Sequence, residues 1–266
     1  MRRSRPLNIT RTSSPDGGQD AGTPRTIAPR AAVPQLLPSP GLPWTSAGIA
    51  TKTTGKVFFK FGSSDYTCSA AAVTSANKST VMTAGHCILE HPMFGTARYA
   101  ANWIFAPAYA NGSQPYGAWT ASILKVSPQW LAGDDFNYDF GAAVVSTLGG
   151  TSLQDTVGAQ GIAFSQPRPI AAYVFGYPSN FSGGQSLTYC SGPTVPDVTG
   201  RANAVGMLCS MSNGSSGGPW LYQFSEATGA GYLNSVTSFK YAFGLTLFGS
   251  YFGTAAETFY DSVQAL

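Results

Sequence analysis

Short apolar runs that alternate with polar residues recur along most of the chain, and turns rich in Gly, Pro, Asn and Ser separate them. Alternation with a period of two places successive side chains on opposite faces, so each run predicts a β-strand. Short strands of this kind are typical of barrels or sandwiches. The first set of expected strands covers residues 56–61, 69–73, 80–83, 103–105, 119–126 and 140–145, and the second covers 162–164, 172–175, 186–190, 206–209, 219–224 and 236–243. The pattern predicts an all-β protein and fits two β-barrels.

Helical spacing occurs near the C-terminus. Thr254 and Glu257 have the spacing of a capping box, which marks the start of a helix. Apolar residues then follow at the spacing of one helix face: Ala255, Phe259, Val263 and Leu266. We expect a short C-terminal helix whose role is packing.

Residues 1–50 lack the strand pattern and are rich in proline, at positions 6, 15, 24, 29, 34, 38, 40 and 43. Such a composition prevents regular helix or sheet. We therefore expect a flexible leader or pro-segment over residues 1–50, followed by a folded domain over residues 51–266. The leader contains no unbroken apolar stretch of the length that a secretory signal needs.

Charge is sparse and unevenly placed. Charged residues make up 10% of the chain, the formal net charge is +3, and arginines at positions 2, 3, 5, 11, 25 and 30 carry the excess. The remainder is slightly acidic, which argues against a nucleic-acid partner. A transmembrane helix needs about 20 apolar residues, and no such run occurs. We expect a monomer that neither binds nucleic acid nor spans a membrane.

Two short motifs supply candidate chemistry: TAGHC at residues 83–87 and GSSGGP at residues 214–219. A serine hydroxyl is a poor nucleophile at neutral pH, so an imidazole must take its proton during attack on a carbonyl and return it to the leaving group. We expect Ser216 to be the nucleophile and His86 the base. His91, the other histidine, is expected in a surface loop.

A carboxylate must hold the imidazole in the correct tautomer. Asp139 is the best candidate because it heads the apolar run 140–145, where a buried carboxylate needs a partner. Glycines around the nucleophile leave room for backbone N–H groups to meet the oxyanion that forms during acyl transfer. The amides of Gly214 and Ser216 are the expected pair.

Chain order separates the serine-hydrolase folds. Residues 214–218 also match the G-x-S-x-G turn of α/β-hydrolases, but that fold needs its acid and then its histidine after the serine, and no histidine follows Ser216. A subtilisin-like order would need Asp65 as the acid, and Asp65 ranks below Asp139 because it lies in a polar loop. The order His86, Asp139, Ser216 is that of chymotrypsin.

On these motifs the chain resembles the trypsin/chymotrypsin-like serine proteases, in a compact, secreted, bacterial form, from about residue 55 to the C-terminus. The resemblance implies two antiparallel six-stranded β-barrels, the first at about 51–148 and the second at about 152–266. The active site would lie in the cleft between them. It also implies a serine endopeptidase that cleaves polypeptide substrates through an acyl-enzyme intermediate, without cofactor or metal.

Four cysteines form two pairs of identical spacing, and four cysteines permit three connectivities. These pairs are Cys68 with Cys87 and Cys190 with Cys209, and the resemblance implies that Cys68 and Cys87 form the disulfide that holds the histidine loop. Disulfides form in oxidising compartments, so we expect a secreted, extracellular protein although no signal peptide is visible. The cysteines lack C-x-x-C spacing, which argues against zinc.

The resemblance also locates a specificity pocket. By spacing, Ser210 falls at its base, where an uncharged residue disfavours Lys and Arg side chains. Residues 238–240, which are Ser238, Phe239 and Lys240, resemble the strand that pairs with the substrate backbone. Lys240 favours an acidic side chain, whereas Thr237 stands where glutamate-specific relatives carry a histidine. Apolar and acidic preferences both stay open.

Ser215 stands where animal digestive enzymes carry an aspartate that captures a newly cut N-terminus. We therefore expect no activation switch of that type.

The main alternative function is a trypsin-fold binding module that has lost activity. Such a module usually lacks the serine or the histidine, and both are present here. A cell-envelope protein with a proline-rich tail would explain residues 1–50 but not the triad.

Overall fold

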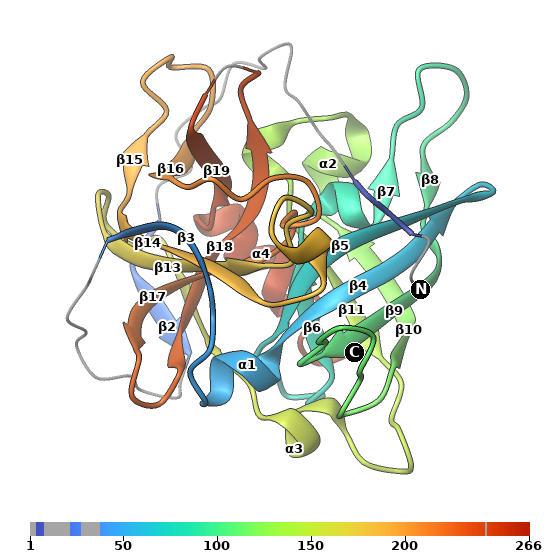
Figure 1. Ribbon diagram of the computed structural model, residues 1–266. Coiled ribbons are helices and arrows are strands. Elements are labelled where there is room, and N and C mark those ends of the chain that lie inside the picture. Colours follow the sequence, from blue (N-terminus) through green and yellow to red (C-terminus); the bar gives the residue numbers. More distant parts are fainter. Residues whose placement is uncertain (1–3, 8–21, 28–37, 243) are drawn as a thin grey trace.

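The computed structural model describes residues 4–7, 22–27, 38–242 and 244–266. Its first sheet contains seven strands, and a pairing between its second and last strands closes six of them into a barrel (Figure 1). Their order in the sheet is β1 (Arg5–Pro6), β5 (Ser64–Ala72), β4 (Thr54–Phe61), β9 (Ala101–Pro107), β10 (Trp119–Val126), β11 (Gly141–Val145) and β6 (Thr80–Thr83).

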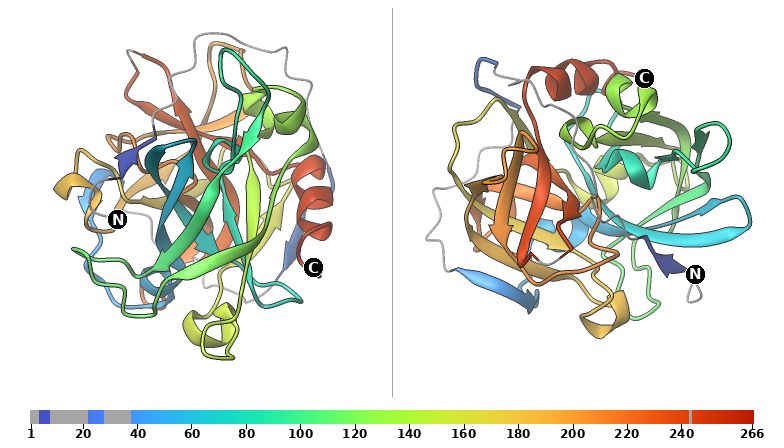
Figure 2. Two further views of the ribbon diagram at one scale, coloured as in Figure 1. Left: turned by 90° about the vertical axis from the view of Figure 1, so that its right-hand side faces the viewer. Right: turned by 90° about the horizontal axis from the view of Figure 1, so that it is seen from above.

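The second sheet curls into a half-barrel beside the first (Figures 1 and 2). Its main path is β15 (Val195–Pro196), β16 (Ala204–Leu208), β19 (Thr246–Tyr251), β18 (Ala230–Lys240), β17 (Pro219–Ser225), β13 (Ala171–Gly176), β14 (Thr188–Pro193) and β3 (Ser39–Pro43). Off this path, β12 (Gly161–Phe164) pairs with β18 and with β2 (Arg25–Ile27). The expected all-β, two-barrel fold is confirmed, with pairings that are antiparallel except for β1–β5 and β12–β18.

Every strand expected from the sequence overlaps a strand of the structure, and β6 and β10 have the expected bounds. Strand β19 was not expected, because Gly249 interrupts its apolar pattern. That glycine is needed for close packing, since a Cβ there would lie 2.3 Å from Ser235 Oγ and 3.1 Å from the Trp220 ring.

Parts of residues 1–50 also form strands, which differs from the expectation that prolines prevent regular structure there. Strands β1, β2 and β3 each join an existing sheet at its margin, where a residue without an N–H is tolerated. Trp44, just after β3, packs edge-on against Phe175 and Tyr189 at 5.1 Å between ring centroids. Arg25 of β2 forms ion pairs with Glu257 and Asp261.

The C-terminal helix is α4 (Thr254–Asp261). Its N-cap is Gly253 and no side chain caps it, so the expected capping box is wrong. The helix begins one residue earlier than that motif requires, and Glu257 binds Arg25 at 2.8 Å instead. The sequence did not predict the one-turn helices α1 (Ile49–Thr53), α2 (Pro128–Ala132) and α3 (Leu153–Val157).

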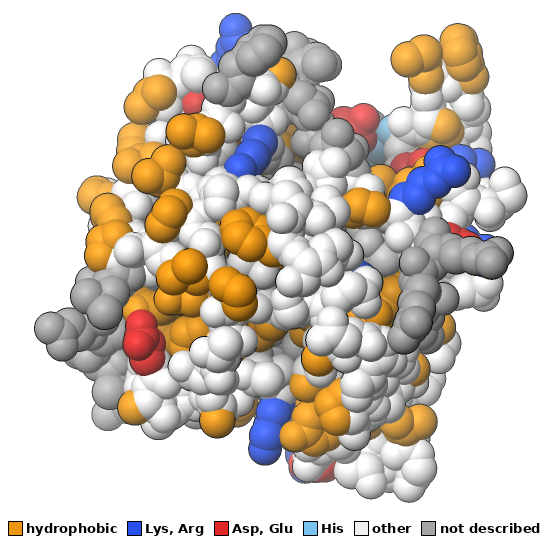
Figure 3. Space-filling view, in the orientation of Figure 1, with side chains coloured by type: hydrophobic (Ala, Val, Ile, Leu, Met, Phe, Trp, Pro, Cys, Tyr) orange, Lys and Arg blue, Asp and Glu red, His pale blue; other side chains and the backbone are white. Residues whose placement is uncertain are grey.

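Among the described residues, no helix combines the length and the apolar character needed to cross a membrane. One buried apolar cluster contains residues of both sheets, including Phe58 of β4, Phe164 of β12 and Phe175 of β13. The two sheets therefore share a core. Apolar side chains also reach the surface at the tip of the hairpin between β7 (Leu89–Glu90) and β8 (Arg98–Tyr99), where Met93 and Phe94 are exposed (Figure 3).

Candidate active site

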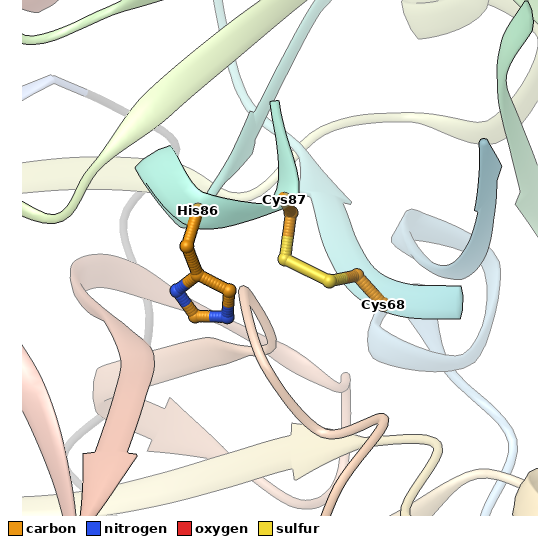
Figure 4. Close-up of side chains that lie close together, drawn as sticks. All are labelled: Cys68, His86 and Cys87. Atoms are coloured by element: carbon orange, nitrogen blue, oxygen red, sulfur yellow. A yellow bond between two sulfur atoms is a disulfide. The ribbon is translucent and has the colours of Figure 1, made fainter. Parts of the chain in front are cut away.

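The candidate base lies on a one-turn helix, η1 (Gly85–Cys87), which follows β6. A disulfide joins Cys87 to Cys68 of β5, as the resemblance implied, and Figure 4 shows the His86 ring beside it. The disulfide ties η1 to the barrel. The His86 side chain is only 2% exposed, so its orientation is set by the protein around it.

Asp139 is fully buried between η2 (Phe136–Tyr138) and β11, and it lies directly against His86. Its Oδ2 is 2.7 Å from His86 Nδ1, and its Oδ1 accepts the backbone N–H of His86 at 2.8 Å. Ser238 Oγ donates a further hydrogen bond to Oδ2 at 2.5 Å. Both oxygens are partnered, which offsets the cost of burying a carboxylate.

Gly85 permits this approach of the two loops. A Cβ at Gly85 would lie 2.8 Å from the Trp130 ring and 3.1 Å from Asp139 Oδ1. Trp130 is itself held by a hydrogen bond from its Nε1 to the carbonyl of Leu89. The glycine before His86 is therefore a packing requirement of the site.

The turn that carries Ser216 is rich in glycine for steric reasons. Gly217 has a φ of +75°, and a Cβ there would lie 2.0 Å from Thr83 Oγ1 and 2.4 Å from the carbonyl oxygen of Ser69. The backbone N–H of Ser69 in turn donates to the Ser216 carbonyl at 2.7 Å. These contacts place the Ser216 turn against β5 and against the end of β6, the strand that leads to His86.

The backbone amides of this turn fall into two groups. Those of Ser215, Gly217 and Gly218 all donate to backbone carbonyls. Those of Gly214 and Ser216 make no hydrogen bond to any described residue. The two amides expected to bind an oxyanion are therefore the two in this turn that donate to no other described residue.

His86 Nε2 is buried and has no hydrogen-bond partner among the described residues. Ser216 is 6% exposed, and its Oγ does not form a hydrogen bond with that nitrogen in the structure. The ring is thus anchored through Nδ1 while Nε2 stays available to accept a proton.

Ser69 belongs to the site, although sequence reasoning did not identify it. Its Oγ accepts the N–H of Tyr177 at 2.9 Å and donates to the carbonyl of Gly214 at 2.8 Å. One buried hydroxyl thereby ties the Gly214 turn to the first barrel. A serine within a strand carries no sequence signal for such a role.

A cavity of about 240 Å³ opens beside Ser216. Its lining consists of residues 211–213, 215–216 and 237–242, with Gly244 and Leu247. The expected substrate-binding residues Ser238, Phe239 and Lys240 line it, whereas Ser210 does not. The side chain of Ser210 donates to the carbonyl of Pro40 at 2.7 Å instead.

Lys240 provides the positive charge of this cavity. Its Nζ donates to the carbonyl of Cys209 at 2.6 Å, and burial lowers the pKa of the amine. The described lining residues include no Asp or Glu. The electrostatic environment of the cavity is therefore unfavourable for a second cation.

The second disulfide joins Cys190 of β14 to Cys209, which precedes the cavity-lining segment 211–213. Both expected disulfide pairings are confirmed. Cys68, His86 and Cys87 have potential metal-ligand atoms within 4.8 Å of one another. Because the two sulfurs are bonded to each other and His86 Nδ1 faces Asp139, this group does not fit a metal.

Comparisons with known proteins show which family and which solved structures the chain is similar to. The family model for trypsin matches residues 48–256. The crystal structure of the protease Anisep from Arthrobacter nicotinovorans has 41% sequence identity and a TM-score of 0.75, and the match covers 85% of this chain and all of that one. A thermostable serine protease, AL20, from an extremophilic microorganism has 40% identity and a TM-score of 0.74, with 81% and 98% of the two chains covered.

A further match, to a curated protein, covers a smaller part of both chains. The extracellular metalloprotease of Bacillus subtilis is 31% identical over 119 residues, which are 44% of this chain. The match covers 34% of that protein, so the chain spans about a third of the relative's length.

Proposed function

The chain belongs to the trypsin family, and from this premise we propose that it is a serine endopeptidase with the triad His86, Asp139 and Ser216. The observation that carries the proposal is the buried pairing of His86 Nδ1 with Asp139, which leaves Nε2 without a hydrogen-bond partner among the described residues. A structural histidine in a protein core would have both nitrogens satisfied. An unpaired buried Nε2 is what a general base needs.

In the proposed reaction, Ser216 Oγ attacks the carbonyl carbon of a peptide bond while His86 Nε2 takes the hydroxyl proton. The oxyanion is met by the amides of Gly214 and Ser216, and each such donor is worth about 3 to 4 kcal/mol. His86 then gives the proton to the departing amine as the C–N bond breaks. Water, deprotonated by His86, hydrolyses the ester and releases the acid and Ser216.

The substrate is a polypeptide in extended conformation, with the side chain on the acyl side of the scissile bond in the 240 Å³ cavity. The cationic Lys240 and the lack of carboxylates among the described lining residues disfavour Lys and Arg at that position. Two disulfides and the matched bacterial proteases support an extracellular location. The presence of Ser216 and His86, with His86 paired to Asp139, supports proteolysis over the inactive binding module.

Covalent labelling tests the proposal. A fluorophosphonate probe should label the protein at Ser216, and Ser216→Ala should abolish labelling and remove about 10⁶-fold of the turnover. Ser215→Ala is the matched control, because Ser215 Oγ is already committed to the Ser212 carbonyl at 2.7 Å. That control should keep most of the activity. Labelling of Ser215, or of neither serine, would refute the proposal.

A further inference from the structure

The N-terminal segment reaches the active-site side of the first barrel. Strand β1 pairs in parallel with β5, with Arg5 opposite Tyr66 and Pro6 opposite Thr67. The N–H of Leu7 also donates to the Thr67 carbonyl at 3.1 Å, and Leu7 packs against the core of the first barrel. Seen from above, β1 lies at the boundary between the two sheets (Figure 2).

The edge of β5 that β1 covers is adjacent to the catalytic residues. Thr67 precedes Cys68, whose disulfide partner Cys87 follows His86. Pro6 lies against the turn of the nucleophile, since a Cβ at Gly214 would be 3.3 Å from Pro6 Cβ. Pro6 therefore lies beside Gly214, one of the two proposed oxyanion-binding residues.

A second, smaller hollow is formed at this place. It has a volume of about 70 Å³, and Ser4 and Pro6 line it together with Thr67, Tyr177 and Ser179. It shares no lining residue with the 240 Å³ cavity beside Ser216. The N-terminal segment thus forms part of the wall of a recess that is separate from that cavity.

A substrate polypeptide must extend on both sides of the bond that is cut. If its acyl side uses the 240 Å³ cavity, its departing half has to leave past β5 and the Gly214 turn. A free strand edge is a common binding site for an extended peptide, because its unpaired N–H and C=O groups accept an added strand. Residues 4–7 are an extended peptide bound in this way.

We propose that the chain's own residues 4–7, which occupy the edge of β5 at Tyr66–Thr67, act as an intramolecular competitor of the departing half of the substrate. The inference rests on the proposed function. Tethering gives such a short segment a high effective concentration, so a few backbone hydrogen bonds suffice for it to compete. Removal of residues 1–7 therefore increases activity on long substrates selectively.

Two substrates test this selectivity. A peptidyl anilide has no amino acid beyond the scissile bond, whereas an internally quenched peptide has about four residues there. Compared with the full chain, a chain that begins at Asn8 should cleave the quenched peptide with a KM lower by roughly tenfold, the effect of about two net hydrogen bonds. Its kinetics on the anilide should not change.

Two full-length variants show whether the effect of truncation comes from losing the contact of β1 with β5 or from shortening the chain. Leu7→Asp should release β1 by placing a charge against the apolar core, and should reproduce the effect of truncation. Arg11→Ala changes an arginine of the same segment outside residues 4–7 and should behave as the wild type. A synthetic peptide of residues 1–10, added to the shortened chain, should restore inhibition on the quenched substrate alone.

The outcomes distinguish this inference from the proposed function. Equal gains on both substrates, or no gain on either, would overturn the inference while leaving a serine protease. If neither substrate is cleaved and the fluorophosphonate does not react, the proposed function itself fails. Binding of the 1–10 peptide to the shortened chain, measured by fluorescence polarisation, is independent of activity, and its absence would also overturn the inference.

Discussion

Asp139 presents its two carboxylate oxygens to two different N–H groups of His86. Oδ1 accepts the backbone N–H at 2.8 Å, and Oδ2 lies 2.7 Å from ring Nδ1. In Asp139→Asn, the amide oxygen would keep the backbone bond and turn its NH₂ toward Nδ1. The ring would then carry its proton on Nε2 and could not accept one from Ser216.

We therefore expect Asp139→Asn to lower kcat by about 10⁴ while the fold is retained. Steady-state kinetics on a peptide substrate and the Tm measure the two effects. A loss below about tenfold would mean that Asp139 does not set the tautomer of His86.

Ser238 provides a milder test of the same carboxylate. Its Oγ donates to Asp139 Oδ2, and a hydrogen bond to a charged group is worth about 1.5–3 kcal/mol. Ser238→Ala should lower kcat by roughly tenfold, with KM less affected. Ser235→Ala is the matched control, because Ser235 is buried in the same strand but donates to the Ser250 carbonyl. It should lower the Tm and leave kcat unchanged.

The role of Ser238 shows what the sequence alone could and could not predict about the site. The two motifs and the apolar run after Asp139 led to the proposed triad of His86, Asp139 and Ser216, because each type of chemistry needs a particular residue in a recognisable local frame. Residues 238–240 were expected to contact substrate, but the direction of each side chain depends on the pairing of β18 with its neighbours. That pairing brings the Ser238 hydroxyl to Asp139, 99 residues away in the chain.

The structure places Lys240 in the wall of the cavity and Ser210 outside it. Ser210 was expected at the base of the specificity pocket, yet its hydroxyl is bonded to Pro40 outside the cavity, and Lys240 supplies the charge inside it. Lys240→Gln removes the only cation among the described lining residues. We expect wild-type cleavage after Lys or Arg to be rare and the variant to cleave there several-fold more often relative to apolar residues.

Cleavage profiling with a peptide library measures this ratio. An unchanged ratio in Lys240→Gln, with kcat on apolar substrates retained, would show that the charge of Lys240 does not determine specificity.

The fold was predictable where short alternating runs lie between turns. Strand β10 alternates apolar and polar residues except at Ile123–Leu124, and its bounds were expected correctly. Strand β3 was not expected, because the sequence Ser39–Pro43 contains two prolines and a glycine. It forms because Tyr189 and neighbouring residues of β14 offer a free edge, and that edge is a property of the assembled sheet and is not visible in the local sequence.

Lys56 makes stability depend on pH. Burial lowers the pKa of its amine from 10.5 to about 8 in the folded protein, where Nζ donates to the Gly184 carbonyl. Between these two pH values the unfolded chain binds the proton and the folded protein does not, so stability rises with pH. Below pH 8 the folded protein bears the full cost of a buried charge.

The variant Lys56→Met lacks this titration. From pH 7 to pH 10 the wild type should gain free energy of unfolding relative to the variant, by an amount on the order of 3 kcal/mol. Urea unfolding of both proteins at the two pH values gives the difference, in which the other titrating groups cancel. A constant difference would mean that Lys56 titrates alike in the folded and unfolded states.

The α-amine of the chain finds no carboxylate at Ser215. Ser215 is buried, its Oγ donates to the Ser212 carbonyl at 2.7 Å, and its N–H donates to the same oxygen at 3.2 Å. The hydroxyl and the N–H of Ser215 are therefore hydrogen-bonded within their own loop, and Ser215 offers no carboxylate to a new N-terminus. Because no ion pair at Ser215 can couple chain cleavage to the oxyanion-binding amides, the identity of the first residue should not matter to catalysis.

Chains that begin at Asn8, Pro15 and Thr23 all lack residues 1–7 and all retain β2 and β3. We expect them to have the same kcat/KM on a peptidyl anilide, and selective acetylation of the α-amine should not change it. The full-length chain should match them on this substrate too, since the anilide does not extend past β5. If a single starting residue gave active enzyme and acetylation abolished that activity, an amine-binding partner other than Ser215 would have to hold the site in its active form.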